Sequence, residues 1–252
     1  MNDHMLVNEN ALTGSGPGID NVILSDFTME GQKNGRKNCI FLDGNDSDRN
    51  TNIQLRGLKV DSCGQQGIHI KGTDNLEMNN IFVSGNGTES EHDHNIYLRR
   101  DSNITISNVI SENAKGNGFN GSELYRLTMT NYIARENGGR GIRVSNSFNV
   151  TISSSIALNN AGVGIMFMDE DGGVEDGLIS GCVSKGNNLY GIELYMADTV
   201  TVTGCVISGN SSYGINETAS SKEVIVGNSI VNNSSPYNSG AVFSVYANNY
   251  SN

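Results

Sequence analysis

The chain has 252 residues, a formal net charge of −11, 36% hydrophobic residues, two Pro and no Trp. A compact globule of this length normally buries more aromatic bulk, whereas a solenoid fills a thin core with small aliphatic side chains. The negative charge argues against nucleic acid as a partner. The sequence contains no apolar run long enough for a membrane span, and residues 1–18 lack the basic start and apolar core of a signal peptide.

The charge is distributed unevenly along the chain. Residues 1–143 carry 14 basic and 18 acidic side chains, while residues 144–252 carry 2 basic and 9 acidic ones. An anionic ligand is therefore expected to bind the N-terminal part. Since residues 1–18 do not resemble a signal peptide, the chain is expected to be either cytoplasmic or part of a longer exported protein, and in the second case an extracellular or virion-associated location is expected.

A Gly-aliphatic pair, or a close variant, recurs along the chain. The second residues of successive pairs are separated by 28, 28, 23, 23, 23, 27, 23 and 26 positions, and they are Ile40, Ile68, Ile96, Phe119, Ile142, Ile165, Ile192, Ile215 and Ala241. Between the pairs, apolar residues alternate with polar ones, which is typical of strands with one buried face. Three such strands and three turns fill one coil of just over twenty residues. A β-sandwich would not keep this apolar phase through four 23-residue intervals.

The sequence therefore predicts an all-β protein, a right-handed parallel β-helix of about nine rungs of 23–28 residues that forms a single domain over 1–252. Strand-like sequence begins at Met5–Val7 and ends at Phe243–Tyr246. Exposed solenoid ends are normally capped, so we expect a fragment, a chain that lacks its caps and self-associates, or one with missing flanking domains.

Two further features follow from the repeat. An Asn recurs five or six positions before the aliphatic residue and is expected to form a hydrogen-bonded ladder along the stack, with members Asn113, Asn137, Asn160, Asn187 and Asn210. The longer coils carry extra turn residues at Gly44–Arg49, Thr88–Asp93, Asp169–Asp176 and Ser234–Asn238. Enlarged turns on a solenoid usually form the walls of a groove.

The residue after each inward aliphatic points outward. On two to four adjacent rungs, these outward positions hold proton-transfer groups and cations. The predicted catalytic groups are Tyr97, His94 and His69, and the predicted substrate-binding groups are Lys71, Arg99, Arg100, Arg143 and Asn120. His69 and Tyr97 should stand one strand spacing apart, as should Lys71 and Arg99. Cations would neutralise the carboxylate of a uronate and acidify the proton α to it, which His or Tyr could remove. Return of a proton to the opposite face gives epimerisation, and expulsion of the C4 oxygen gives β-elimination.

Residues 103–168 resemble the catalytic β-helix module of alginate (mannuronan) C5-epimerases. The segments that carry the resemblance are Asn103-Ile104-Thr105-Ile106, Gly118-Phe119, Met129-Thr130-Asn131, Gly141-Ile142 and Val150 through Gly164-Ile165. The resemblance implies a β-helix that binds polyuronate on this outward face, often with calcium. The family's catalytic Tyr-Gly-Phe-Asp-Pro-His strand is missing. The nearest positions have His94 in place of its Tyr, Tyr97 in place of its Asp and Arg99 in place of its His.

Two acidic or histidine-containing runs and four cysteines are the candidates for metal binding and thiol chemistry. The run His92-Asp93-His94 could hold a metal ion if it formed a strand, and Asp169-Glu170-Asp171 could hold Ca²⁺, but its spacing fits a solvated turn better than a calcium loop. We expect no metal site and no cofactor, with calcium as the alternative. The four Cys form no metal-binding pattern. Cys182 and Cys205 should stack on adjacent rungs, as buried thiols in preference to a disulfide.

Three functional hypotheses remain open. The first is a carbohydrate-active β-helix whose partner is an acidic polysaccharide, most plausibly a polyuronate C5-epimerase or lyase relative. The second is a non-catalytic polysaccharide-binding or phage tailspike-like solenoid. The third is a structural solenoid without a site.

Overall fold

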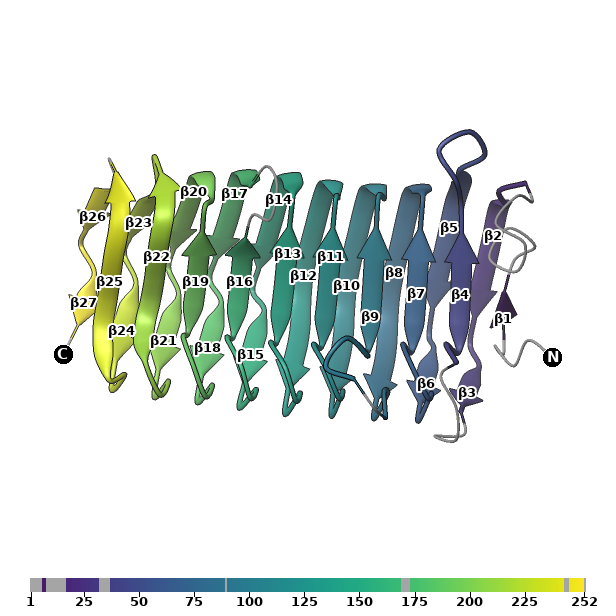
Figure 1. The fold of residues 1–252 in the computed structure, drawn as a ribbon, viewed down its shortest axis with the longest axis horizontal. Helices are drawn as coiled ribbons and strands as arrows, with labels where there is room; N and C mark the ends of the chain where they lie inside the picture. The colour runs from purple at the N-terminus through teal and green to yellow at the C-terminus, as the bar shows by residue number, and fades with distance from the viewer. Residues whose placement is uncertain are drawn as a thin grey trace.

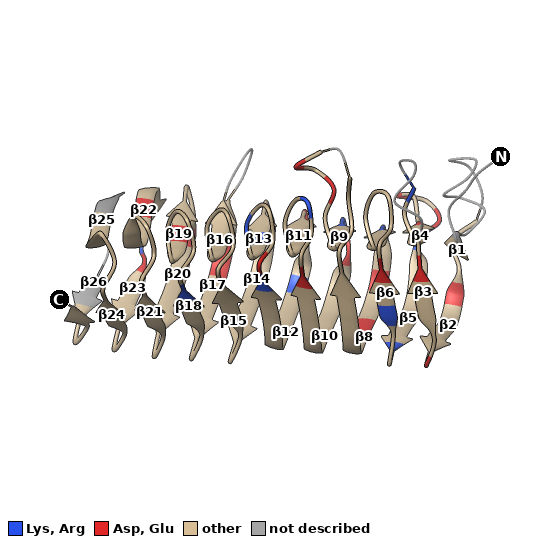
Figure 2. Cartoon of the chain, turned by 90° about the horizontal axis from the view of Figure 1, so that it is seen from below, with Lys and Arg blue, Asp and Glu red and all other residues tan. Residues whose placement is uncertain are grey.

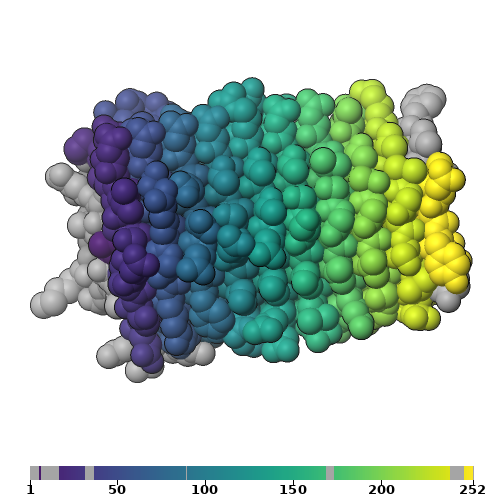
Figure 3. Space-filling model, turned by 180° about the vertical axis from the view of Figure 1, so that it is seen from behind, coloured from purple at the N-terminus to yellow at the C-terminus, as the bar shows by residue number. Residues whose placement is uncertain are grey.

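A computed structural model describes residues 6–7, 17–31, 37–88, 90–168, 173–242 and 245–251. All strand pairings are parallel, and each strand pairs with its equivalents in the preceding and following coils. The result is an elongated stack with the N- and C-termini at opposite ends (Figure 1). The predicted all-β parallel solenoid is confirmed. From behind, successive rungs pack against each other as bands of one continuous surface (Figure 3).

Three ladders run along the stack. The first ladder consists of β1 (Leu6–Val7), β4 (Ile40–Asp43), β7 (Ile68–Lys71), β9 (Ile96–Arg99), β11 (Phe119–Ser122), β13 (Ile142–Ser145), β16 (Ile165–Met168), β19 (Ile192–Tyr195), β22 (Tyr213–Ser221) and β25 (Ser235–Val242). The second ladder consists of β2 (Asp20–Ser25), β5 (Asn50–Arg56), β8 (Thr73–Ser84), β10 (Ser102–Glu112), β12 (Tyr125–Arg135), β14 (Ser147–Ser153), β17 (Val174–Ser180), β20 (Asp198–Thr203), β23 (Val224–Val226) and β26 (Val245–Ala247).

The third ladder consists of the C-terminal halves of β8, β10 and β12 together with β3 (Thr28–Glu30), β6 (Lys59–Asp61), β15 (Ile156–Leu158), β18 (Val183–Lys185), β21 (Val206–Ser208), β24 (Ser229–Val231) and β27 (Tyr250–Ser251). The three long strands pass from the second ladder to the third at Asn80, Asn108 and Asn131, where φ is 55°, 54° and 53°. Asn tolerates this left-handed conformation better than most residues, so it turns the chain without ending the strand.

The predicted inward column is confirmed. Ile68, Ile96, Phe119, Ile142, Ile165 and Ile192 are successive register partners in the first ladder, and none has measurable exposure. The residues that follow them face outward. The core is therefore a thin column of stacked aliphatic side chains, as the low aromatic content predicts.

The last predicted rung is wrong. Ile215 pairs with Tyr237 and not with Ala241, and residues 235–238, predicted as an enlarged turn, lie within β25. Tyr237 packs partly buried against the core, so an aromatic ring continues the aliphatic column at this rung. Gly240 instead pairs with Thr218. The Gly-Ala pair imitates the repeat in sequence but lies four positions further along the strand.

The buried Asn ladder is confirmed from Asn137 onward. Each side-chain amide donates to the carbonyl oxygen of the next, with N–O distances of 2.8 to 3.0 Å through Asn137, Asn160, Asn187, Asn210 and Asn233. The prediction for Asn113 is wrong: Asn113 is exposed with φ of 56°, and Ala114 takes the ladder position. The side chain of Asn95 fills the gap, because its Oδ1 accepts from Asn86 at 2.7 Å and its Nδ2 reaches Ser111 at 2.9 Å.

The cysteines fall into two pairs. Cys39 and Cys63 form a disulfide between the first and third ladders, with a Cα–Cα distance of 5.7 Å, which the sequence did not predict. Cys182 and Cys205 are buried thiols on adjacent rungs, as predicted.

We predict that Ile142→Asp lowers the free energy of unfolding by at least about 3 kcal/mol, because it places an unpaired carboxylate in a dry core. Arg143→Ala, one position along the same strand and on the outward face, should change it by less than about 1 kcal/mol. Urea denaturation of both variants measures the difference. Similar losses in the two variants would contradict the inward and outward assignment.

Candidate functional site

The outward column of the first ladder is continuous across the N-terminal rungs. Phe41, His69, Tyr97, Asn120 and Arg143 are successive register partners on β4, β7, β9, β11 and β13. The prediction that His69 and Tyr97 stand one strand spacing apart is confirmed, since their ring centroids are 4.8 Å apart and stacked. His69 also stacks on Phe41 at 4.5 Å. His69 is thus held between two aromatic rings and stacks on one face of the Tyr97 ring.

A cavity of about 550 Å³ opens on this face in front of Tyr97. Its lining combines the outward column with the turns beside it and consists of Gln66, Glu91, His92, His94, Tyr97, Asn117, Asn120, Gly138, Gly139, Arg140, Arg143 and Met168. Glu91 and His92 come from the enlarged turn Thr88–Asp93, so this turn forms a wall as predicted. The carboxylate of Asp93 accepts from the backbone N–H of Ser90 at 3.1 Å and thereby fixes the turn.

His94 is buried and neutral in this wall. Burial, as the largest cause, and the positive charge of Arg143, as the next, lower its pKa to about 3. Its Nδ1 accepts a hydrogen bond from the backbone N–H of Asn117 at 3.0 Å. A backbone amide can only donate, so the proton of the neutral ring lies on Nε2. His94 can therefore donate a hydrogen bond at Nε2.

Side-chain amides contact both arginines of the lining. The side-chain carbonyl oxygen of Asn120 accepts from Arg143 Nη1 at 3.0 Å and from Asn117 Nδ2 at 3.1 Å. Arg143 Nε donates to Met168 Sδ at 3.0 Å. The Asn117 side chain also accepts from the backbone N–H of Arg140 at 2.8 Å. Asn120 is buried, and its carbonyl oxygen contacts the guanidinium of Arg143.

Two polar atoms of the lining have unused hydrogen-bonding capacity. Among the described residues, the buried Oε1 of Gln66 and the buried Nε of Arg140 have no hydrogen-bond partner. Buried polar groups are nearly always paired, so exceptions at a cavity point to a ligand or to ordered water. Gln66 supplies an acceptor and Arg140 supplies a charged donor.

The remaining predicted cations lie outside this lining and are paired with carboxylates. Lys71 and Arg99 are register partners as predicted, but Lys71 lies 3.0 Å from Asp43 and Arg99 lies 2.8 Å from Glu123. Arg100 bridges Glu123 at 3.1 Å and Asp46 at 3.6 Å. Interactions first with Glu123 and then with Tyr97 raise the pKa of Arg99.

The sequence interpretation missed Arg140, Asn117 and Gln66, and it considered His92 only as a possible metal ligand. The first three share a signal that could have identified them, because each lies one position before a Gly-aliphatic pair or its variant, as His94 does. Their carbonyls accept from the coil above or below at this turn, so the side chains form a second column beside the outward one. Residues three apart, such as Arg140 and Arg143, therefore converge from turn and strand.

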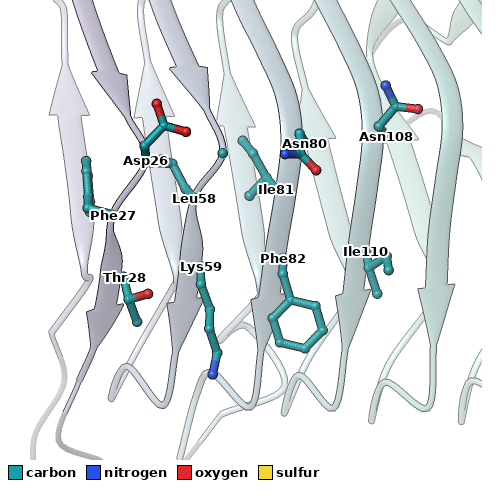
Figure 4. A pocket seen from close by; sticks show the side chains of 11 residues that line it. Asp26, Phe27, Thr28, Leu58, Lys59, Asn80, Ile81, Phe82, Asn108 and Ile110 are labelled. Atoms are coloured by element: carbon teal, nitrogen blue, oxygen red, sulfur yellow. The ribbon is translucent and has the colours of Figure 1, made fainter.

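A second cavity, of about 530 Å³, lies along the third ladder. Figure 4 shows Phe27, Phe82 and Ile110 along it, with Lys59 between the two phenylalanines. Asp26 and Lys59 are the charged residues of its lining. It lacks the pairing of proton-transfer groups with guanidinium groups that marks the first cavity.

Metal ligands do not gather in the part of the chain that the structure describes: no three His, Cys, Asp or Glu side chains are placed to hold an ion. In the His92-Asp93-His94 run, His92 is exposed while His94 is buried, so the two imidazoles face different environments. Asp169-Glu170-Asp171 lies outside the described residues. The described ranges also contain no helix long and apolar enough to cross a membrane.

The profile of the right-handed β-helix region family matches residues 11–175 and 170–252. No curated protein matches the chain in sequence. Among solved structures, the A-module of the mannuronan C-5 epimerase AlgE4 of Azotobacter vinelandii superposes with a TM-score of 0.63 at 20% identity, over 84% of this chain and 63% of that one.

The periplasmic alginate epimerase AlgG gives a TM-score of 0.71 at 16% identity, over 81% of this chain and 51% of that one. The pectate lyase Pel9A gives 0.61 at 16% identity, over 92% and 72%. At these identities the likeness concerns the fold. This chain spans about half to two thirds of the two epimerase structures.

Because His94 is neutral in the folded chain, we predict that the free energy of unfolding depends on pH. The unfolded chain binds a proton at this residue below pH 6.5, whereas the folded chain does so only near pH 3. Stability from this residue is therefore complete above pH 6.5 and declines as the pH falls, by about 2 kcal/mol at pH 5. Urea unfolding at pH 7 and pH 5 should show this loss in the wild type and not in His94→Asn, which keeps the acceptor. Equal losses would mean that the folded protein protonates His94.

Proposed function

The chain belongs to the right-handed β-helix family, and on this scaffold we propose that it acts on an acidic polysaccharide, with one uronate residue held in the cavity between His94 and Arg143. The observation that carries the proposal is the convergence of two guanidinium groups, a neutral imidazole and a phenol on one 550 Å³ cavity. Solved β-helices of similar fold include alginate epimerases and a pectate lyase, which supports this ligand class.

In this proposal, Arg140 and Arg143 bind the uronate carboxylate. Arginine offers paired donors that fit a carboxylate, and a site that excludes water strengthens the interaction. Asn120 holds Arg143 in place, and His94 Nε2 donates a hydrogen bond to the sugar or its carboxylate. Arginine neutralises the carboxylate in this scheme, so removal of calcium with a chelator should leave binding unchanged.

We assign the base to Tyr97 rather than to His94, since the Nδ1 lone pair of His94 is already engaged with Asn117. Tyr97 as phenolate, next to Arg99, takes the C5 proton of the uronate, and the electron pair moves onto the carboxylate held by the arginines. A proton then returns to the other face of C5, which gives epimerisation. Alternatively the C4–O bond breaks, its oxygen leaves with the electron pair and takes up a proton, and an unsaturated uronate forms.

We predict that Arg140→Ala and Arg143→Ala each weaken binding of a uronic-acid oligosaccharide about tenfold or more, because each removes a charged donor to the carboxylate. Lys185→Ala on β18 is the matched control, since it removes one exposed cation from the third ladder. Calorimetry on the oligosaccharides of alginate, pectate and hyaluronan gives the affinities. Wild-type protein that binds no uronic-acid polymer would exclude the proposal.

Tyr97→Phe should leave binding within about twofold and lower turnover by about a hundredfold or more, because only the phenolic oxygen is lost. Absorbance of the unsaturated uronate reports elimination, and exchange of the C5 proton in heavy water reports epimerisation. Binding by the wild type without either signal would instead favour the non-catalytic, tailspike-like hypothesis for the same cavity.

A further inference from the structure

The two columns that form the cavity continue toward the C-terminus. In the turn column, the carbonyls of Arg140, Val163, Tyr190 and Tyr213 each accept from the glycine N–H of the preceding coil at 2.9 to 3.0 Å, so these residues occupy the same position in successive turns. In the outward column, Arg143, Met166, Glu193 and Asn216 are successive register partners. The cavity is thus one end of a strip of matched positions that runs along the stack.

The chemistry of this strip changes from cationic to aromatic along its length. Tyr190 and Tyr213 lie two and three rungs beyond Arg140, and their ring centroids are 5.9 Å apart. With a strand spacing of about 4.8 Å, the aromatic pair begins roughly 10 Å from the Arg140 position, a distance that a disaccharide spans. Both tyrosines are partly exposed, and aromatic side chains in a carbohydrate site stack on the apolar C–H faces of sugar rings.

Glu193 lies beside this aromatic pair. It is buried, and its Oε1 accepts from Asn216 Nδ2 at 3.0 Å. Burial raises the pKa of the Tyr190 hydroxyl, and the negative charge of Glu193 raises it further, which reflects their proximity. The only cations of residues 144–252 are Lys185 and Lys222. Lys185 belongs to the third ladder, and Lys222 pairs with Asp198 at 3.0 Å. Figure 2 shows the same decline of basic residues toward the C-terminal rungs.

We propose that the ligand of this strip is a heteropolysaccharide in which the uronate residue of the cavity is linked to a neutral sugar that stacks on Tyr190 and Tyr213. This inference rests on the proposed function, because it takes the cavity as the uronate site. A polymer of uronate alone would bring a further carboxylate against Glu193, where like charges repel and Arg140, whose positive charge reaches Glu193, is already assigned to the uronate of the cavity. A neutral sugar instead donates a hydrogen bond from a hydroxyl group to the carboxylate of Glu193 and stacks on the tyrosine rings.

The experiment measures the affinities of oligosaccharides of equal length from alginate, pectate, hyaluronan and unsulfated chondroitin. The first two consist of uronates, and the last two alternate uronate with a neutral N-acetylhexosamine. The tightest ligand is expected to be an alternating one, bound about tenfold more tightly than the uronate homopolymers. Tyr190→Ala and Tyr213→Ala should each weaken it about fivefold or more. Tyr125→Ala is the matched control, because Tyr125 is an exposed aromatic residue of the second ladder.

Glu193→Gln should raise the affinity for the uronate homopolymers and leave the affinity for the alternating ligand nearly unchanged. The ratio of affinities between the alternating polymers and the homopolymers therefore falls. The inference alone is overturned if a homopolymer binds most tightly and its binding depends on Arg140 but not on Tyr190. If the wild type binds none of the four polymers, the proposed function fails, and the inference fails with it.

Discussion

The parallel register between successive coils is the constraint on which the rest of this structure depends. Each strand hydrogen-bonds to its equivalents above and below, so a residue lies about one strand spacing from the residue at the same position in the next coil. Ile142 therefore sits between Phe119 and Ile165 in the core, and Arg143 sits between Asn120 and Met166 outside. A slip of one residue would exchange the two sets. The Asn ladder enforces the same register inside the core, since an amide can donate to its neighbour only when the coils are aligned.

The register tolerates insertions because turns absorb them. The coil that contains Thr88–Asp93 is five residues longer than the 23-residue coils, yet Ile68 and Ile96 remain partners. Gly87, with φ of 84°, begins this turn, and a Cβ there would lie 2.4 Å from Cβ of Asp93. The turn thus needs glycine to fold back against the stack. The wall that it forms helps to bury His94, so an insertion that leaves the core untouched creates the low-dielectric environment that keeps the imidazole neutral.

Electrostatics in the groove are local. The chain is acidic, so long-range attraction does not concentrate an acidic polymer at its surface. Three of the predicted cations, Lys71, Arg99 and Arg100, pair with carboxylates of neighbouring rungs, while Asn120 accepts a hydrogen bond from the guanidinium of Arg143 and Asn117 accepts one from the backbone N–H of Arg140. The difference lies in what stands one rung away: Glu123 follows Arg99 and Arg100, whereas Asn117 and Asn120 precede Arg140 and Arg143. Neighbouring coils therefore decide which side chains hold each cation.

The sequence by itself determined the solenoid, the inward column and the face that carries the chemistry, because all three depend on the period of the repeat. It also placed Tyr97, His94, Asn120 and Arg143 together, since equal phase means adjacency. Only the tertiary structure decided that Lys71, Arg99 and Arg100 are ion-paired, that Cys39 and Cys63 join, and that Arg140 and Gln66 line the cavity. These features depend on side-chain direction at turns, where no period-2 alternation fixes which way a residue points. Tyr237 replaced Ala241 for a similar reason, because burial and pairing, rather than resemblance to the Gly-aliphatic motif, select the residue that closes the core.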